Sequence, residues 1–344
     1  MDAPRRILIV RLSAIGDVIH GLPVACALRN AMPKAFIAWA VEGRAGDLLE
    51  GHPALNEVVR MPRGWLKSPS QVRRLRACLK SLDFDTTIDL QGLTKSAICA
   101  RLSGAKRRIG FAKPDGREIS PWLNNQLVTA TSPHVIERNL ELLGALGISD
   151  ATVEFKLPET PADAATAAAI VDRQQLAGGF AIVNPGAGWP SKLWPADRFA
   201  AVARHLSNRH RLPTLVVWAG EAERQLAETI VAGAPGAAAI APATSLTELA
   251  ALARRARVFV ASDTGPLHIA AAAGTPCVGL FGPMPARRNG PYGSQHIAVQ
   301  RVCLEGSSRE RRRAGPESME AITVEDVCAA CESILAAGAA RRCA

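Results

Sequence analysis

The feature that most constrains the fold is a series of short apolar runs separated by helical patterns. Such runs are typical of buried strands, and their regular alternation with helices predicts βαβ units and a parallel sheet. The low aromatic content, 4% of the chain, agrees with a core built from Ala, Val, Leu and Ile. The runs include RRILIVRL, FIAWAVE, DTTIDL, FAIVNPG, LPTLVVWAG, RVFVASD and PCVGLFG.

The length of 344 residues favours two domains, because one core rarely grows beyond about 250–300 residues. The alternation lapses at ISDATVEFKLPETPADAA, which is rich in turn formers, and then resumes. We therefore expect an N-terminal domain over 1–160 and a C-terminal domain over 161–320. A last helix over 321–338, with Thr323 as N-cap and Asp326 as its partner, is expected to pack back on the N-terminal domain.

Composition narrows the class of protein. No run reaches the ~18 apolar residues of a membrane helix, so we expect no transmembrane segment and a cytosolic chain. Eight cysteines are scattered, and the Cys328 and Cys331 pair lacks the second pair of a zinc site. The net charge is +10, and residues 1–150 hold 21 Lys and Arg against 14 Asp and Glu. Nucleic acid, anionic lipid and phosphorylated substrates all fit this charge.

The loop VNPGAGWPSKLWP follows an apolar strand and contains Gly186, Gly188 and Lys192. Glycines let backbone N–H groups approach a ligand closely, and a lysine adds a positive charge. The loop is either a phosphate-binding loop or a plain strand-to-helix turn with an exposed lysine.

The segment VFVASDTGPLHIAAAAG places a helix start at the end of another strand. Asp263 or Thr264 is a suitable N-cap, and the unpaired N–H groups of such a start attract anions. Gly265 is sterically open, and His268 lies in the first turn, either as a ligand contact or as a structural histidine.

Two acidic residues at other strand ends could likewise have either a functional or a structural role. Glu221 in VVWAGEAERQ is either a carboxylate for ribose hydroxyls or an early-turn glutamate favoured by the helix dipole. Asp17 in RLSAIGDVIHGLP, at the start of a helix expected from Asp17 to about Ala31, is either a cap or a catalytic base.

Basic residues gather in two acid-free stretches, Arg60 to Leu82 and Leu93 to Pro114. They form either a solvated helix face or a surface for acceptor phosphates and an anionic membrane. The residues that we assign to acceptor binding are Arg63, Lys67, Arg73, Arg74, Arg76 and Lys95.

The chain resembles the lipopolysaccharide heptosyltransferases in four segments, which occur in the order that the family has. They are RLSAIGDVIHGLP, TIDLQGLTKSA, VNPGAGWPSKLWP and SDTGPLHIAAAAGTPCVGLFGP. Matching segments run from about residue 5 to 335. The resemblance implies an α/β chain of two facing Rossmann-like domains of GT-B type, with parallel sheets and an interdomain cleft.

The resemblance also implies an inverting transfer of heptose from an ADP-heptose donor to a phosphorylated Kdo–lipid A acceptor, with no cofactor and no metal. Apart from the resemblance, we expect a cytoplasmic monomer that is peripheral on the inner leaflet of the inner membrane and does not bind nucleic acid. The family's donor phosphate contacts correspond to Lys192, Thr264, Gly265 and His268, its nucleotide-sugar contact to Asp263, its ribose contact to Glu221 and its proposed base to Asp17.

One departure from the family pattern and three rival functions remain. Several relatives have a cysteine-rich stretch after the last strand, whereas this chain keeps only Cys303 there. A nucleotide-sugar epimerase would share the two-domain scheme but would need no basic acceptor surface. A non-catalytic anion- or membrane-binding module is disfavoured by the few aromatics, and a nicotinamide enzyme by the lack of Gly-x-Gly-x-x-Gly after the first strand.

Overall fold

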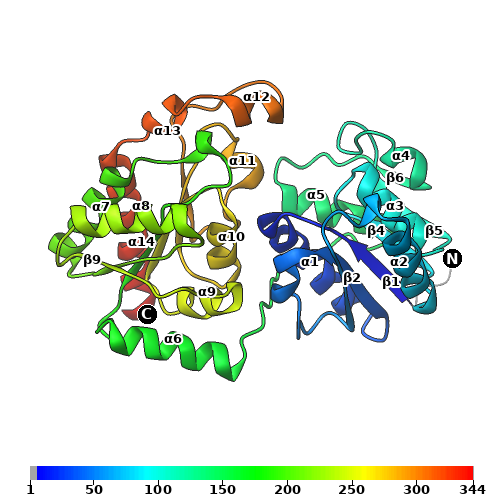
Figure 1. Ribbon diagram of the computed structural model, residues 1–344, viewed down its shortest axis with the longest axis horizontal. Coiled ribbons are helices and arrows are strands. Elements are labelled where there is room, and N and C mark those ends of the chain that lie inside the picture. The colour runs from blue at the N-terminus through cyan, green and yellow to red at the C-terminus, as the bar shows by residue number, and fades with distance from the viewer. Residues whose placement is uncertain (1–5, 344) are drawn as a thin grey trace. The chain divides into compact units, whose positions relative to one another are not determined.

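The structure is a computed structural model that describes residues 6–343. The chain divides into two compact units, Met1–Pro158 and Glu159–Ala344, and each is described by itself. The division falls beside the boundary expected at residue 160. Figure 1 follows the chain through both units.

The first unit is a six-stranded parallel sheet in the order β3-β2-β1-β4-β5-β6. Its strands are β1 (Arg6–Val10), β2 (Phe36–Glu42), β3 (Glu57–Met61), β4 (Thr86–Asp89), β5 (Arg107–Phe111) and β6 (Gln126–Val128). Its α-helices are α1 (Ile15–Ala31), α2 (Pro69–Ser81), α3 (Thr94–Leu102), α4 (Ser120–Leu123) and α5 (Val135–Glu141), and its short 3₁₀ turns are η1 (Gly43–Leu48), η2 (Trp65–Lys67) and η3 (Leu142–Leu146).

The second unit repeats the plan, with a six-stranded parallel sheet in the order β12-β11-β10-β7-β8-β9. Its strands are β7 (Ala181–Asn184), β8 (Thr214–Val216), β9 (Ala238–Ile240), β10 (Val258–Ser262), β11 (Cys277–Leu280) and β12 (Ile297–Val299). Its helices are α6 (Pro161–Arg173), α7 (Ala196–His210), α8 (Glu221–Gly233), α9 (Leu246–Ala253), α10 (Gly265–Ala272), α11 (Ala286–Asn289), α12 (Ser308–Arg313), α13 (Glu317–Glu320) and α14 (Val324–Cys343), with one 3₁₀ turn, η4 (Pro190–Lys192).

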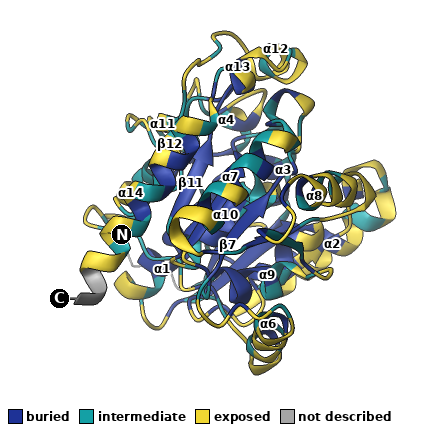
Figure 2. Ribbon diagram, turned by 90° about the vertical axis from the view of Figure 1, so that its left-hand side faces the viewer, coloured by how far each residue is buried: buried dark blue, intermediate teal, exposed yellow. Residues whose placement is uncertain are grey.

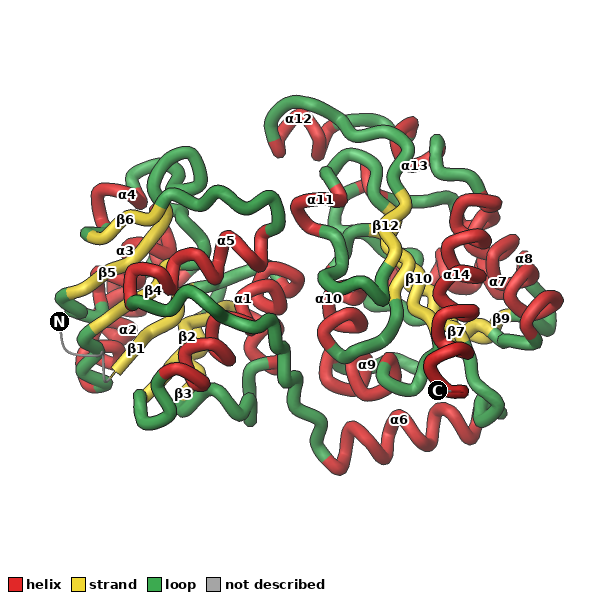
Figure 3. Tube along the Cα trace, turned by 180° about the vertical axis from the view of Figure 1, so that it is seen from behind, coloured by secondary structure: helices red, strands yellow, loops and turns green. Residues whose placement is uncertain are grey.

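Both sheets have the strand order of a doubly wound Rossmann fold, counted from the first strand of each unit. The predicted parallel α/β architecture is therefore confirmed. The central strands are buried because helices cover both faces of each sheet, which explains why their sequences are continuously apolar. Figure 2 shows these buried strands, and Figure 3 shows the helices on either side of them.

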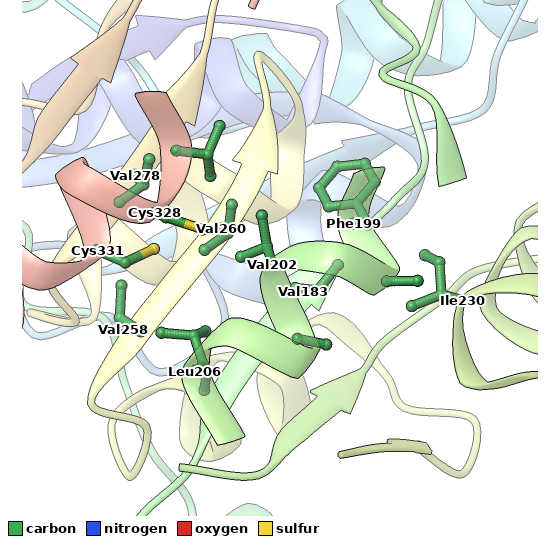
Figure 4. Close-up of a cluster of buried hydrophobic side chains, with 14 of the residues drawn as sticks. Val183, Phe199, Val202, Leu206, Ile230, Val258, Val260, Val278, Cys328 and Cys331 are labelled. Atoms are coloured by element: carbon green, nitrogen blue, oxygen red, sulfur yellow. The ribbon is translucent and has the colours of Figure 1, made fainter. Parts of the chain in front are cut away.

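The C-terminal helix differs from its expected position. α14 packs against α7 and strands β10 to β12 of the second unit. Val327, Cys331 and Ile334 belong to the second unit's core, and Figure 4 shows Cys328 and Cys331 among that core's valines. The expectation that this helix returns to the N-terminal domain is wrong, because its apolar face completes the core beside the sheet that precedes it. The predicted cap is confirmed: Asp326 N–H donates to Thr323 Oγ1 at 3.2 Å.

The start of α1 can be compared with its prediction, and the end of α10 shows a common helix stop. α1 begins at Ile15, two residues before the expected start, so Asp17 is its third residue. Gly274 follows the end of α10 with a φ of +89°, the left-handed conformation that favours glycine after a helix. Among the described residues, no helix combines the length and apolar character needed to cross a bilayer.

Candidate functional site

In the second unit, the sequence-predicted residues gather at the carboxyl edge of the sheet. Lys192 ends the turn η4 after β7, and Glu221 begins α8 after β8. Asp263 directly follows β10, and Thr264 is the N-cap of α10. Ligands of open parallel sheets bind at this edge because the loops and helix starts face it.

The buried carboxylate of Asp263 contacts side chains from two other positions at this edge, Lys192 in η4 and His268 in α10. Asp263 Oδ2 accepts from Lys192 Nζ at 2.6 Å, and Asp263 Oδ1 lies 3.1 Å from His268 Nε2. The Asp263 and His268 side chains are 6% and 5% exposed, and that of Lys192 is 12% exposed. The structure therefore brings together three residues that the sequence placed in two separate motifs.

Burial alone would raise the pKa of the Asp263 carboxyl. The hydrogen bond to His268 and the positive charge of Lys192 outweigh that effect, so its pKa lies below the ordinary value. Asp263 is therefore a permanent negative charge between two potential cations at neutral pH.

The start of α10 offers hydrogen-bond donors beside Asp263 and Lys192. Thr264 has extended backbone angles, and its Oγ1 is buried without a hydrogen-bond partner in the described part of the chain. Gly265 and Leu267 lie in the first turn, where backbone N–H groups have no partner within the helix, and Pro266 between them carries no N–H. An anion at this position would gain the hydroxyl, the N–H groups and the helix dipole together.

The glycine loop has a partner that sequence analysis missed. A Cβ built on Gly186 would meet the Glu223 carboxyl at 2.1 Å, whereas one on Gly188 would meet open space. Glu223 Oε2 accepts from Ala219 N–H at 2.9 Å, while Glu221 is exposed at the first residue of α8. The carboxylate that faces the glycine loop thus belongs to Glu223, two residues after Glu221, which we predicted as the ribose contact.

Glu223 differs from an ordinary surface glutamate. Burial raises its pKa, against hydrogen bonds from the Ala219 N–H and the Asn184 side chain that lower it. A signal for it was present, since the third residue of a helix can reach back to backbone N–H groups before the helix start. Glu221, at the first position, cannot make that bond.

A second missed contact involves the indole of Trp189. Lys192 Nζ lies 4.3 Å from the ring centroid, and the Arg312 guanidinium lies 4.8 Å from it. Arg312 belongs to α12, a short Arg-rich helix that contacts η4. This arrangement places a second cation beside the loop, from a basic helix later in the chain.

In the first unit, Asp17 has two partners. Asp17 Oδ2 accepts from Ala14 N–H at 3.0 Å, and Asp17 Oδ1 pairs with Arg11 Nη2 at 2.5 Å. Arg11 also donates to the Leu90 carbonyl and is largely buried. The side chain of Asp17 is 37% exposed. The cap geometry is therefore present, and part of the carboxylate stays accessible to a ligand from solvent.

The predicted acceptor residues fall into two groups. Arg63, Lys67 and Lys95 follow β3 and β4 at the carboxyl edge of the first sheet, and Lys95 pairs with the buried Glu42. Arg73, Arg74 and Arg76 lie on the exposed face of α2, whose Leu75 and Leu79 are buried. Only the first group shares an edge of the sheet with Asp17.

Comparisons with known proteins agree on one family. The sequence profile of glycosyltransferase family 9 (heptosyltransferase) matches residues 72–317. Lipopolysaccharide heptosyltransferase 1 of Pseudomonas aeruginosa is 32% identical over 309 residues, which are 85% of this chain and 82% of that protein.

Solved structures agree on the fold. The family 9 glycosyl transferase of Veillonella parvula matches with a TM-score of 0.86 at 22% identity, over 98% of this chain and 99% of that one. Escherichia coli heptosyltransferase WaaC, solved with ADP-2-deoxy-2-fluoro heptose, matches with a TM-score of 0.72 at 25% identity, over 95% and 99%.

The Lys192–Asp263 pair predicts a pH-dependent effect on stability. Lys192→Met removes one partner of a buried carboxylate, so we expect a loss of roughly 2–3 kcal/mol in unfolding free energy at pH 7. Because the folded-state pKa of Asp263 is depressed, its contribution is present above the unfolded pKa and is lost as the pH falls through the folded value. The difference from wild type should therefore shrink below about pH 5 in urea titrations.

Arg224→Met is the matched control, because it breaks an exposed pair with Glu228 on α8. It should cost less than about 0.5 kcal/mol. Equal losses in the two variants would show that Lys192 contributes no more than a surface ion pair.

Proposed function

The chain belongs to glycosyltransferase family 9, the heptosyltransferases, and we propose that it transfers a heptose from ADP-heptose to the inner core of lipopolysaccharide. The acceptor hydroxyl attacks the anomeric carbon, the bond to the ADP oxygen breaks, and the configuration inverts. The family match favours transfer over the epimerase that shares the architecture and over a non-catalytic binding module.

The observation that carries this proposal is the second-unit site around Asp263. ADP leaves with growing negative charge, which fixed cations and N–H dipoles stabilise. Lys192, the Thr264 hydroxyl and the start of α10 can supply them, with His268 in the first turn. Arg312, beside the same Trp189 ring, adds a further cation that the resemblance did not imply.

We further propose that the donor diphosphate is bound without a metal and that no cofactor takes part. A magnesium ion beside a nucleotide is usually held by one or two carboxylates together with the phosphates. Asp263 already contacts Lys192 and His268, so its oxygens are engaged. An unchanged rate of heptose transfer after treatment with a chelator would agree with metal-free binding of the diphosphate.

We place the acceptor and the membrane on the side of the first unit, with the enzyme as a cytoplasmic monomer peripheral to the inner leaflet. Four of the five exposed large apolar side chains among the described residues lie in that unit: Leu66, Ile119, Trp122 and Leu127. Trp122 is 80% exposed, and exposed tryptophans are typical of a membrane interface, where basic residues elsewhere on the unit would add attraction to anionic lipid. The phosphates of a Kdo–lipid A acceptor suit the same positive charge.

The proposal is tested by incubating the purified full chain with ADP-heptose and Kdo–lipid A and measuring the product mass. We expect addition of one heptose and release of ADP. UDP- and GDP-sugars should be poor donors, and calorimetry should show ADP binding more tightly than UDP. Transfer from UDP-sugars at an equal rate would overturn the donor assignment and leave the fold intact.

The paired glutamates allow a matched test of the nucleotide site. Glu223→Gln should weaken ADP binding about 10-fold or more, because the carboxylate beside Gly186 loses its charge and part of its hydrogen bonding. Glu221→Gln is the control, since it removes an exposed charge from the same turn. If Glu221→Gln is the more harmful substitution in calorimetry, the ribose contact predicted from sequence is the correct one.

Asp17→Asn separates the base from the cap. Asparagine can still accept from Ala14 N–H, but it cannot take the acceptor's proton, so kcat should fall roughly 10²–10⁴-fold with ADP affinity unchanged. The lost pairing with Arg11 should cost about 1 kcal/mol of stability at most, because Asp17 is partly exposed. Retention of more than about a third of wild-type kcat, where chemistry limits the rate, would assign Asp17 to capping alone.

Replacing Arg73, Arg74 and Arg76 by Gln should raise the KM for the phosphorylated acceptor and flatten its salt dependence, with the donor KM unchanged. Binding to anionic vesicles should weaken in the same variant. The matched control replaces Arg173, Arg209 and Arg211, three exposed arginines of the second unit, by Gln. If both variants change the acceptor KM and vesicle binding equally, the arginines of α2 act only through the net charge of the protein.

A further inference from the structure

A cluster of metal-ligating side chains lies on the second unit, outside the site described above. His205 and His210 come from the last turns of α7, and Glu332 comes from α14. One ligand atom from each of the three residues lies within 4.8 Å of the other two. The side chains are between 28% and 44% exposed, so an ion from solvent can reach them.

The distances from the carboxylate oxygen to the two histidine nitrogens are close to the spacing that a small tetrahedral ion requires. Ligands about 2.0–2.1 Å from Zn²⁺ at tetrahedral angles lie roughly 3.4 Å from one another. Glu332 Oε1 lies 3.0 Å from His205 Nε2 and 3.9 Å from His210 Nε2, on either side of that value. Small rotations of the side chains would equalise the two distances.

The simplest reading without a metal is an ion pair that ties α14 to α7. One histidine is enough for that role, and His205 Nε2 supplies it at 3.0 Å, yet His210 Nε2 also lies 3.9 Å from the same carboxylate oxygen. Their ring centroids lie 6.1 Å apart with an interplanar angle of 60°. Two nitrogens converging on one oxygen from a neighbouring helix resemble three corners of a coordination site.

We propose that His205, His210 and Glu332 bind a divalent ion of the zinc class, with water in the fourth position. Two imidazoles and one carboxylate suit Zn²⁺, Co²⁺ or Ni²⁺, whereas Mg²⁺ and Ca²⁺ prefer oxygen ligands alone. Arg209 and Arg211 flank His210 along the chain and are exposed, so solvent screens their repulsion of a bound cation.

This ion would stabilise the unit and take no part in the transfer. η4 with Lys192 precedes the start of α7, whereas the histidines lie in its last turns. At about 1.5 Å per residue, the two ends of this 15-residue helix are ~20 Å apart. The bound ion would instead join α7 to α14, the helix that completes the second unit's core.

The test uses the full chain without an affinity tag, stripped of metal and titrated with ZnCl₂ by calorimetry at about pH 8, where unperturbed imidazole is neutral. We expect one site, and a Tm that rises by roughly 5–10 °C when free Zn²⁺ is about 100 times the Kd. Because Cys78 and Cys303 are exposed, both are first changed to Ser. The Co²⁺ complex should lack a thiolate charge-transfer band.

His210→Asn and Glu332→Gln should each weaken Zn²⁺ binding at least 10-fold and remove the rise in Tm. His210→Asn leaves the closer pair of His205 and Glu332 intact, so loss of binding cannot be attributed to a broken ion pair. Glu325→Gln, an exposed carboxylate on α14, is the control and should bind Zn²⁺ like wild type. Unchanged binding in His210→Asn and Glu332→Gln, or no binding by wild type, would overturn the proposal whatever sugar the enzyme transfers.

Discussion

The second unit's site depends on one buried carboxylate. Asp263 fixes Lys192 from the loop after β7 and His268 from the first turn of α10, so two separate backbone segments share one electrostatic anchor. A buried carboxylate with two polar partners is costly to protonate or to leave unpaired, which keeps both side chains in place before a ligand arrives. Preorganisation of this kind lets the site meet developing charge without first moving its own groups.

The parallel sheet decides where such an anchor can form. Every strand of a parallel sheet delivers its following loop to the same edge, so β7, β8 and β10 bring three distant sequence segments together. The first unit repeats this arrangement after β1, β3 and β4, where Arg11, Arg63 and Lys95 lie. The carboxyl edge of each sheet is thus rich in ionisable groups. The helix N-termini at these edges carry partial positive charge and favour anionic ligands.

Sequence patterns predicted the two sheets and the α10 start, because buried strands and helix caps depend on local composition. They failed where the outcome depends on packing between distant elements. α14 was assigned to the wrong unit because an amphipathic pattern shows that a helix has an apolar face without showing which core receives it. Glu223 was missed for a related reason: its proximity to Gly186 arises from two loops that the strand order places side by side.

Asp17 shows why capping and catalysis are hard to separate from sequence alone. A carboxylate at the third position of α1 satisfies a backbone N–H, and its pairing with Arg11 holds it at the edge where the acceptor is proposed to bind. The contacts that fix its position are also the contacts that a general base needs for orientation, since a misplaced oxygen cannot reach the attacking hydroxyl. One carboxylate oxygen accepts from Ala14 N–H and the other pairs with Arg11, so the proposed base would take the acceptor proton on a lone pair that neither partner uses. As the proposed base, Asp17 would receive the acceptor hydroxyl from its exposed side, because Arg11 and the start of α1 cover the other.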